Sequence, residues 1–66
     1  MPFVHIDWVS GQSPEKQAEV ARRVNAAVSE VTGIAPNDIW VVFQEVPADA
    51  WYVGDRSVKQ IKSGGT

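Results

Sequence analysis

Apolar and polar side chains alternate in two stretches of the chain, and the alternation predicts two β-strands. Residues 2–9 are apolar except for His5 and Asp7, which fall on one face because successive side chains of a strand point to opposite faces. Residues 39–46 are rich in β-branched and aromatic side chains, a composition typical of strands. Alternation along this second strand separates Trp40, Val42 and Gln44 from Ile39, Val41, Phe43 and Glu45.

Between the two predicted strands, the apolar spacing changes to that of a helix. Ser13 is suited to cap a helix that begins at Pro14 and runs to about Thr32, and Gly33 is suited to end it. The pair Arg22-Arg23 is expected on the solvated face. The predicted helix covers one face of a sheet with a single apolar stripe, formed by Val20, Ala21, Val24, Ala27, Val28 and Val31.

The order strand, helix, strand predicts a β-α-β unit, with parallel strands and a right-handed crossover. Two strands and one helix do not close a core, so we expect several copies of the chain to complete the sheet. Residues 51–55 form a short strand-like stretch in which Gly54 marks a turn or a close approach. Residues 57–62 show little pattern, and residues 63–66 are expected to form a flexible tail. Residues 1–66 are therefore predicted to form a single domain.

Composition also favours an oligomer. A chain of 66 residues buries only about 60% of the surface that its unfolded form exposes, so its own core is marginal. The sequence has no cysteine, so disulfides and thiolate metal sites cannot supply the missing stability. Three tryptophans, two phenylalanines and one tyrosine are a large aromatic content for this length, and a partner subunit is expected to cover some of them.

Charge and hydropathy exclude several classes of partner. The net charge is −2 and the six basic residues are scattered, so we expect no binding of nucleic acid or of an anionic membrane surface. No apolar run approaches the ~20 residues of a membrane span, and the first residues lack the order of a signal peptide. His5 has no second histidine with which to bind a metal ion. A cytoplasmic protein is the expectation.

The amino terminus carries the candidate chemistry. Removal of Met1, which a small second residue such as Pro2 permits, would leave a secondary amine at the start of an apolar strand. A free α-amino group has a pKa near ~7.7–8.0, and an apolar wall disfavours its cation, which moves the pKa towards the range suited to a general base. The alternative is that Pro2 merely begins a strand, where its missing N–H costs nothing. Position alone leaves both interpretations open.

Several residues, in this order and spacing, resemble the 4-oxalocrotonate tautomerase subgroup of the tautomerase superfamily. They are Met1-Pro2 before an apolar strand, Gly11-Gln12-Ser13 before a helix with Glu15-Lys16-Gln17, Pro36 before a Val-rich strand that ends at Glu45, then Trp51 and Gly54. The resemblance covers nearly the whole chain. It implies an α+β fold of the tautomerase type, a short β-α-β protomer with a terminal β-hairpin. It also implies a homohexamer, built as a trimer of dimers, or a related oligomer whose active sites are shared between neighbouring chains.

The resemblance further implies a cofactor-independent tautomerase in which Pro2 is the catalytic residue for proton transfer on a 2-keto or enol acid. Family members bind the substrate carboxylate with arginines at two positions that Gln12 and Trp40 occupy here. An amide and an indole offer no fixed charge for a carboxylate, so a dicarboxylate substrate is not expected. Trp51 matches the family's active-site aromatic, and Arg56 is a candidate substitute cation. Trp40 and Trp51 together favour a dry pocket and a substrate with an aromatic or apolar side chain, or else they pack at an interface.

Three alternatives stay open at this stage. Superfamily relatives that hydrate or dehalogenate unsaturated acids pair the proline with a carboxylate, for which Asp7 and Glu45 are candidates. The chain is alternatively a subunit of a hetero-oligomer, in which a companion paralogue supplies the missing arginines. The third alternative is a non-catalytic oligomeric module in which Pro2 is structural and Met1 is retained.

Overall fold

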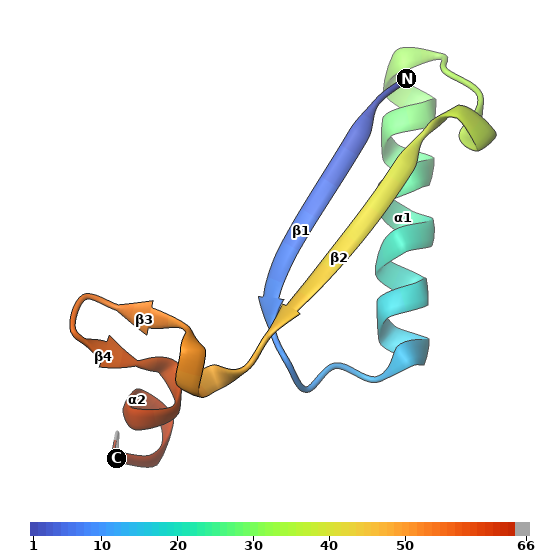
Figure 1. Ribbon diagram of the computed structural model, residues 1–66. Helices are drawn as coiled ribbons and strands as arrows, with labels where there is room; N and C mark the ends of the chain where they lie inside the picture. The colour runs from blue at the N-terminus through green and yellow to red at the C-terminus, as the bar shows by residue number, and fades with distance from the viewer. Residues whose placement is uncertain (65–66) are drawn as a thin grey trace.

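A parallel β-α-β unit forms one part of the molecule, and a small C-terminal arm forms the other (Figure 1). The computed structural model describes residues 1–64. Strand β1 spans Phe3–Val9, helix α1 spans Pro14–Thr32 and strand β2 spans Trp40–Val46. The two strands pair in parallel register from Phe3 opposite Trp40 to Val9 opposite Val46. This arrangement confirms the predicted β-α-β protomer.

The ends of α1 are set by local chemistry. The side chain of Ser13 accepts a hydrogen bond from the backbone N–H of Lys16 at 3.2 Å, and Pro14 needs no such partner. At the other end Gly33 adopts a left-handed conformation with φ of 78°, and its N–H donates to the carbonyl of Ser29 at 2.8 Å. Both predicted caps are therefore confirmed.

The apolar stripe of α1 is shorter than predicted. Val20, Val24 and Val28 are partly buried towards the sheet, but Ala27 is exposed and Val31 is 85% exposed. A helix of 19 residues is about 28 Å long, whereas a strand of seven residues spans only about 23 Å. The last turn of α1 therefore extends past the sheet and has nothing to cover.

The sheet has one covered face and one open face. Trp8 and Phe43 lie on the covered face with ring centroids 4.9 Å apart, and Ile39, just before β2, is 5% exposed. Within residues 1–64, Ile39 is the one buried apolar side chain. The other face has no layer packed on it in Figure 1. We call this the open face; its residues are Phe3, His5, Asp7 and Val9 of β1 and Trp40, Val42, Gln44 and Val46 of β2.

Residues of the helix tie the start of β2 to α1. The side-chain amide of Asn25 donates to the carbonyl of Pro36 at 3.0 Å and to that of Ile39 at 3.2 Å. Pro36–Asp38 form the short 3-10 helix η1 between α1 and β2. These two hydrogen bonds fix the point at which β2 begins, directly beside the first residues of the chain.

The C-terminal arm contains the expected terminal hairpin. After the 3-10 helix η2 at Ala48–Ala50, strand β3 (Tyr52–Val53) pairs antiparallel with β4 (Arg56–Ser57). Gly54 turns the chain between them with φ of 70°, a conformation that strains residues with a Cβ. The prediction of a turn at this glycine is therefore confirmed.

The segment after the hairpin differs from the prediction. Residues 58–62, expected to lack pattern, and Ser63 and Gly64, expected in a flexible tail, form helix α2 (Val58–Gly64). The side chain of Ser57 accepts from the N–H of Gln60 at 3.1 Å, and the side chain of Gln60 accepts from the N–H of Ser57 at 2.8 Å. This reciprocal capping box begins the helix. The rest of the predicted tail, residues 65–66, lies outside the described residues.

Candidate functional site

Pro2 is held at the head of β1 next to Trp40. The backbone N–H of Trp40 donates to the carbonyl of Pro2 at 3.0 Å, which extends the parallel ladder by one residue beyond Phe3. The Trp40 side chain is 52% exposed on the open face, and Phe3 opposite it is 59% exposed. Two large aromatic side chains therefore flank the amino-terminal end of the sheet, where Pro2 is fixed through its backbone.

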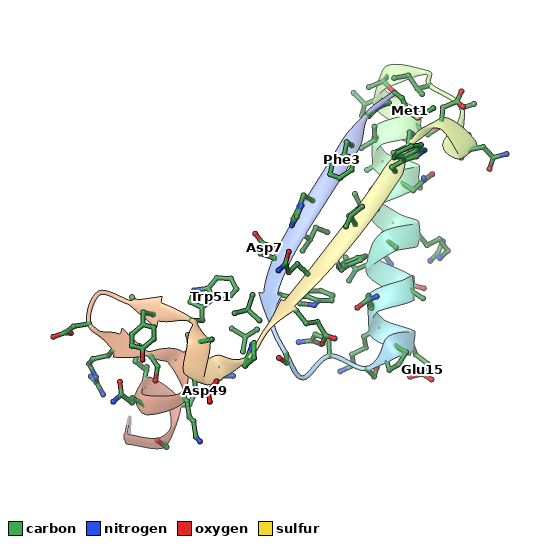
Figure 2. All side chains as sticks on the ribbon, in the orientation of Figure 1. Met1, Phe3, Asp7, Glu15, Asp49 and Trp51 are labelled. Carbon is green, nitrogen blue, oxygen red and sulfur yellow. The ribbon has the colours of Figure 1, made fainter. Side chains whose placement is uncertain are left out.

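The other predicted site residues lie towards the opposite end of the sheet. Trp51 follows the carboxyl end of β2 and lies near Asp7, far from Met1 and Phe3 (Figure 2). Gln12 is exposed in the loop between β1 and α1. The seven residues of β1 separate the two ends by about 23 Å. One protomer thus brings Pro2 and Trp40 together but keeps them away from Gln12 and Trp51.

Trp51 lines an open cavity of about 440 Å³ between the sheet and the arm. The open face supplies one wall, with His5, Asp7 and Gln44, and the arm supplies the other, with Trp51 and Tyr52. Val46 and Ala50 complete the lining. The carbonyl of Trp51 accepts a hydrogen bond from the N–H of Val58 at 2.8 Å, which ties Trp51 to the start of α2. A pocket of this size suits a small organic molecule.

Arg56 does not line the cavity that contains Trp51. It lies in β4 opposite Val53 and is exposed. The helix arginines are engaged elsewhere, because Arg22 and Arg23 both donate to the carboxylate of Glu19. The hydrogen bonds from these two guanidinium groups lower the pKa of Glu19 to about 2. These three residues form the expected solvated charged face, and the arginines contribute nothing to the cavity.

Of the polar residues in this wall, the sequence singled out only Asp7, as a candidate for water activation, and gave His5 and Gln44 no role in a site. It placed His5 and Asp7 on one face, and the structure shows that their side chains are joined, with His5 Nε2 and Asp7 Oδ1 2.8 Å apart. Gln44 lies opposite Asp7 in the register of the two strands. The spacing of a histidine and an aspartate two residues apart on a strand was the available signal, because such side chains are neighbours on one face.

No group of three His, Cys, Asp or Glu side chains within residues 1–64 is arranged to hold a metal ion. No helix in this part of the chain combines the length and the apolar character needed to cross a membrane. Glu45, the second carboxylate considered for water activation, lies on the face opposite Asp7, since it pairs with Trp8.

Comparison with known proteins gives matches along nearly the whole chain. Residues 2–61 match the family model described as tautomerase enzyme. The 2-hydroxymuconate tautomerase of Pseudomonas putida is 31% identical over 61 residues, which are 92% of this chain and 97% of that protein.

Two solved structures share the fold. TomN, a 4-oxalocrotonate tautomerase homologue in the tomaymycin biosynthetic pathway, superposes with a TM-score of 0.93 at 28% identity, over 98% of this chain and 100% of that chain. A heterohexamer 4-oxalocrotonate tautomerase from Chloroflexus aurantiacus J-10-fl gives a TM-score of 0.86 at 31% identity, over 92% and 98% of the two chains. Since the family match starts at Pro2 and spans both strands, α1 and most of the arm, this chain belongs to the 4-oxalocrotonate tautomerase subgroup of the tautomerase superfamily.

Proposed function

We propose that this protein is a cofactor-independent tautomerase in which Pro2, as the amino-terminal residue after removal of Met1, transfers a proton on a 2-keto or enol acid. The observation that carries the proposal is the position of Pro2 at the head of β1, where the tautomerase family match begins. Met1 is 77% exposed, so a processing enzyme can reach it. Removal converts the Pro2 nitrogen from an amide, which is not basic, into a secondary amine.

The reaction needs only this amine and a bound substrate. In ketonisation of an enol acid, the amine accepts the proton of the enol hydroxyl, and the resulting ammonium delivers a proton to the carbon atom of the C=C bond that does not carry this hydroxyl. The product is an isomer of the substrate, so no oxidant, reductant or metal ion is required. Trp40 and Phe3 are the large aromatic side chains at this end of the sheet. Their apolar surfaces would exclude water from the amine, which would disfavour its cation and keep it available as a base.

We further propose that each site is assembled from neighbouring copies. β1 pairs with β2 along one edge, and no strand within residues 1–64 pairs with its other edge. Antiparallel pairing of two such β1 edges would bring Pro2 of one copy to the end of the sheet that carries Gln12 and Trp51 in the other. A homohexamer made of three such dimers, or a related oligomer, is the proposed assembly; the relative from Chloroflexus aurantiacus is a heterohexamer.

The substrate we propose has an aromatic or apolar side chain. Trp40 is exposed beside Pro2, and Trp51 and Tyr52 are among the residues that line the cavity at the other end of the sheet. The Pseudomonas putida relative is a 2-hydroxymuconate tautomerase, and 2-hydroxymuconate is a dicarboxylate. Gln12 and Trp40 provide no cation for a second carboxylate, so an arylpyruvate enol such as phenylenolpyruvate is the better fit.

The test combines intact mass with kinetics. We expect the purified protein to lack Met1 and to ketonise phenylenolpyruvate with a rate that depends on one titrating group. The variant Pro2→Ala should lose about 10²–10⁴-fold in kcat/KM, the usual contribution of a general acid-base residue. Pro14→Ala is the matched control, since Pro14 is exposed at the first position of α1 and should leave kcat/KM unchanged.

Each of three results would overturn part of the proposal. Equal turnover by Pro2→Ala would remove Pro2 from the mechanism. A wild-type protein that retains Met1 in a host able to remove it, with no rate above buffer, would favour the non-catalytic module. Co-purification with a second tautomerase chain that restores activity would assign the protein to a hetero-oligomer instead.

A further inference from the structure

The cavity between the sheet and the arm has a hydrogen-bonding character that Pro2 chemistry does not explain. Its sheet wall carries a joined pair of side chains, His5 and Asp7, with 2.8 Å between Nε2 and Oδ1. Both side chains remain accessible, at 43% for His5 and 56% for Asp7. Its arm wall is formed by the aromatic residues Trp51 and Tyr52. The cavity therefore has aromatic residues on one side and a polar pair on the other.

The polar pair offers mainly acceptors. A carboxylate has no proton to donate, so the hydrogen bond at Asp7 Oδ1 uses the proton on His5 Nε2. In a neutral imidazole whose Nε2 carries the proton, Nδ1 is an acceptor, and the second oxygen of Asp7 is another. Gln44, opposite Asp7 in the adjacent strand, adds an amide that serves as donor or acceptor. A ligand group that donates a hydrogen bond is matched to this wall.

The charge of Asp7 acts in the same direction. Among the residues that line the cavity, Asp7 is the carboxylate, and neither lysine nor arginine belongs to the lining. The lysines and Arg56 of the arm belong to β4 and α2, outside that lining. A second carboxylate of a substrate would meet a like charge here without a compensating cation, and like charges at short range repel.

We propose that His5, Asp7 and Gln44 form the specificity wall of a pocket that binds an aromatic ring against Trp51 and Tyr52, selects a ring bearing a hydrogen-bond donor, and rejects a second carboxylate. This inference rests on the proposed function, since the ring is that of the 2-keto or enol acid whose reacting end lies at Pro2 of a neighbouring copy. The donor is a hydroxyl or amino group at the far side of the ring. Asp7 is a specificity residue and takes no part in proton transfer.

The first test uses the unmodified protein and unreactive probes. Phenylacetate, 4-hydroxyphenylacetate and 4-carboxyphenylacetate differ only in the group at the far side of the ring, and binding is followed by tryptophan fluorescence. We expect the affinity for the hydroxyl probe to exceed that for phenylacetate by about tenfold, the size of one charge-assisted hydrogen bond. The dicarboxylate probe should bind more weakly than phenylacetate. Equal affinities for the three probes would overturn the inference.

The second test replaces the charge without changing the shape. Asp7→Asn should bring the hydroxyl and phenyl probes to within about threefold of one another, and it should raise turnover of 2-hydroxymuconate relative to phenylenolpyruvate by about tenfold. Asp49→Asn is the matched control, because Asp49 lies in η2 beside Ala50 but does not line the cavity (Figure 2). Asp49→Asn should change neither ratio.

The outcomes separate this inference from the proposed function. Pro2→Ala should keep the probe selectivity while losing turnover, because binding at the wall does not use the amine. Selective binding of the probes by a wild-type protein with no tautomerase activity would contradict the proposed function but support the specificity wall. The specificity wall would be overturned if Asp7→Asn kept normal activity with unchanged probe and substrate ratios. It would also be overturned if this variant dissociated the oligomer, because the His5–Asp7 pair would then have a structural role.

Discussion

Trp40 occupies one of the two positions at which the resemblance to the tautomerase family predicts an arginine. Its side chain is 52% exposed, its backbone N–H donates to the carbonyl of Pro2, and it lies opposite Phe3 in the sheet. An indole offers one N–H and a large apolar face, whereas a guanidinium offers a bidentate fork and a fixed positive charge. We therefore expect the identity of this one side chain to determine whether the Pro2 end of the sheet is apolar or attracts anions.

We predict that Trp40→Arg changes the substrate preference of the protein. The introduced cation should raise kcat/KM for 2-hydroxymuconate relative to phenylenolpyruvate by about tenfold, because a guanidinium binds a carboxylate through two charge-assisted hydrogen bonds. Steady-state kinetics with both substrates measure this ratio. Trp40→Phe is the control, since it keeps an aromatic ring without the charge and should leave the ratio near that of the wild type. An unchanged ratio in Trp40→Arg would place this residue outside the substrate site.

Single residues of the site were predictable from the sequence only where position along the chain carried the information. Pro2 follows the initiator position and precedes an apolar strand, so its role as candidate was visible without coordinates. The pairing of His5 with Asp7 was predictable in part, because alternation placed both side chains on one face. Their 2.8 Å contact depends on rotamers that the sequence does not encode. His5 and Asp7 line one cavity with Trp51 because of how the arm folds back to the sheet, and no local sequence pattern specifies this fold.

At the scale of elements, the arm controls where Trp51 lies. The N–H of Val58, the first residue of α2, donates to the carbonyl of Trp51 at 2.8 Å. Helix α2 begins there because Ser57 and Gln60 cap each other, and the Ser57 residue is only 4% exposed. The capping box thus fixes the start of a short helix and, through it, one wall of the cavity.

Removal of the cap should loosen the arm without touching the β-α-β unit. Ser57→Ala should destabilise α2 by about 1 kcal/mol, the usual cost of losing an N-cap side chain. Hydrogen exchange at the α2 amides measures the loss, and weaker binding of ring probes should accompany it. Ser63→Ala is the matched control: the Ser63 hydroxyl donates to the carbonyl of Lys59 on the exposed side of the same helix. Equal exchange in the two variants would show that the capping box does not govern α2.

Helices α1 and α2 differ in how well they could be predicted from the sequence. α1 carries a repeated apolar spacing over 19 residues, with a capping serine and a terminal glycine, so several independent signals agreed. α2 has only seven residues, too few for a periodic stripe to stand out. Its one local signal was the spacing of Ser57 and Gln60, which is typical of a capping box. That spacing was not interpreted as a helix start: residues 57–62 were expected to show little pattern, and a flexible tail was expected from Ser63 onwards.

At the scale of the whole molecule, the protomer is too extended to be a complete globular domain. Its radius of gyration is 15.3 Å, whereas a compact chain of 66 residues is expected near 11 Å. Its accessible surface is 4903 Å², above the roughly 4100 Å² typical of a folded monomer of this mass. The excess includes the open face, with Phe3, Trp40 and Val42 exposed. This shape is what a subunit shows when its core is completed by its neighbours.

Two valines provide a test of whether the open face is an interface between copies of the chain. Val42 lies on the open face directly opposite His5 and is 39% exposed, while Val31 is 85% exposed on the overhanging last turn of α1. If the open face packs against other copies, a lysine at position 42 places an unpaired charge in an apolar interface, which costs several kcal/mol. Val42→Lys should therefore dissociate the oligomer in sedimentation experiments and lose tautomerase activity with it, because Pro2 no longer meets Trp51 of another copy. Val31→Lys should preserve both mass and activity, and an intact, active oligomer in Val42→Lys would leave the open face without a role in assembly.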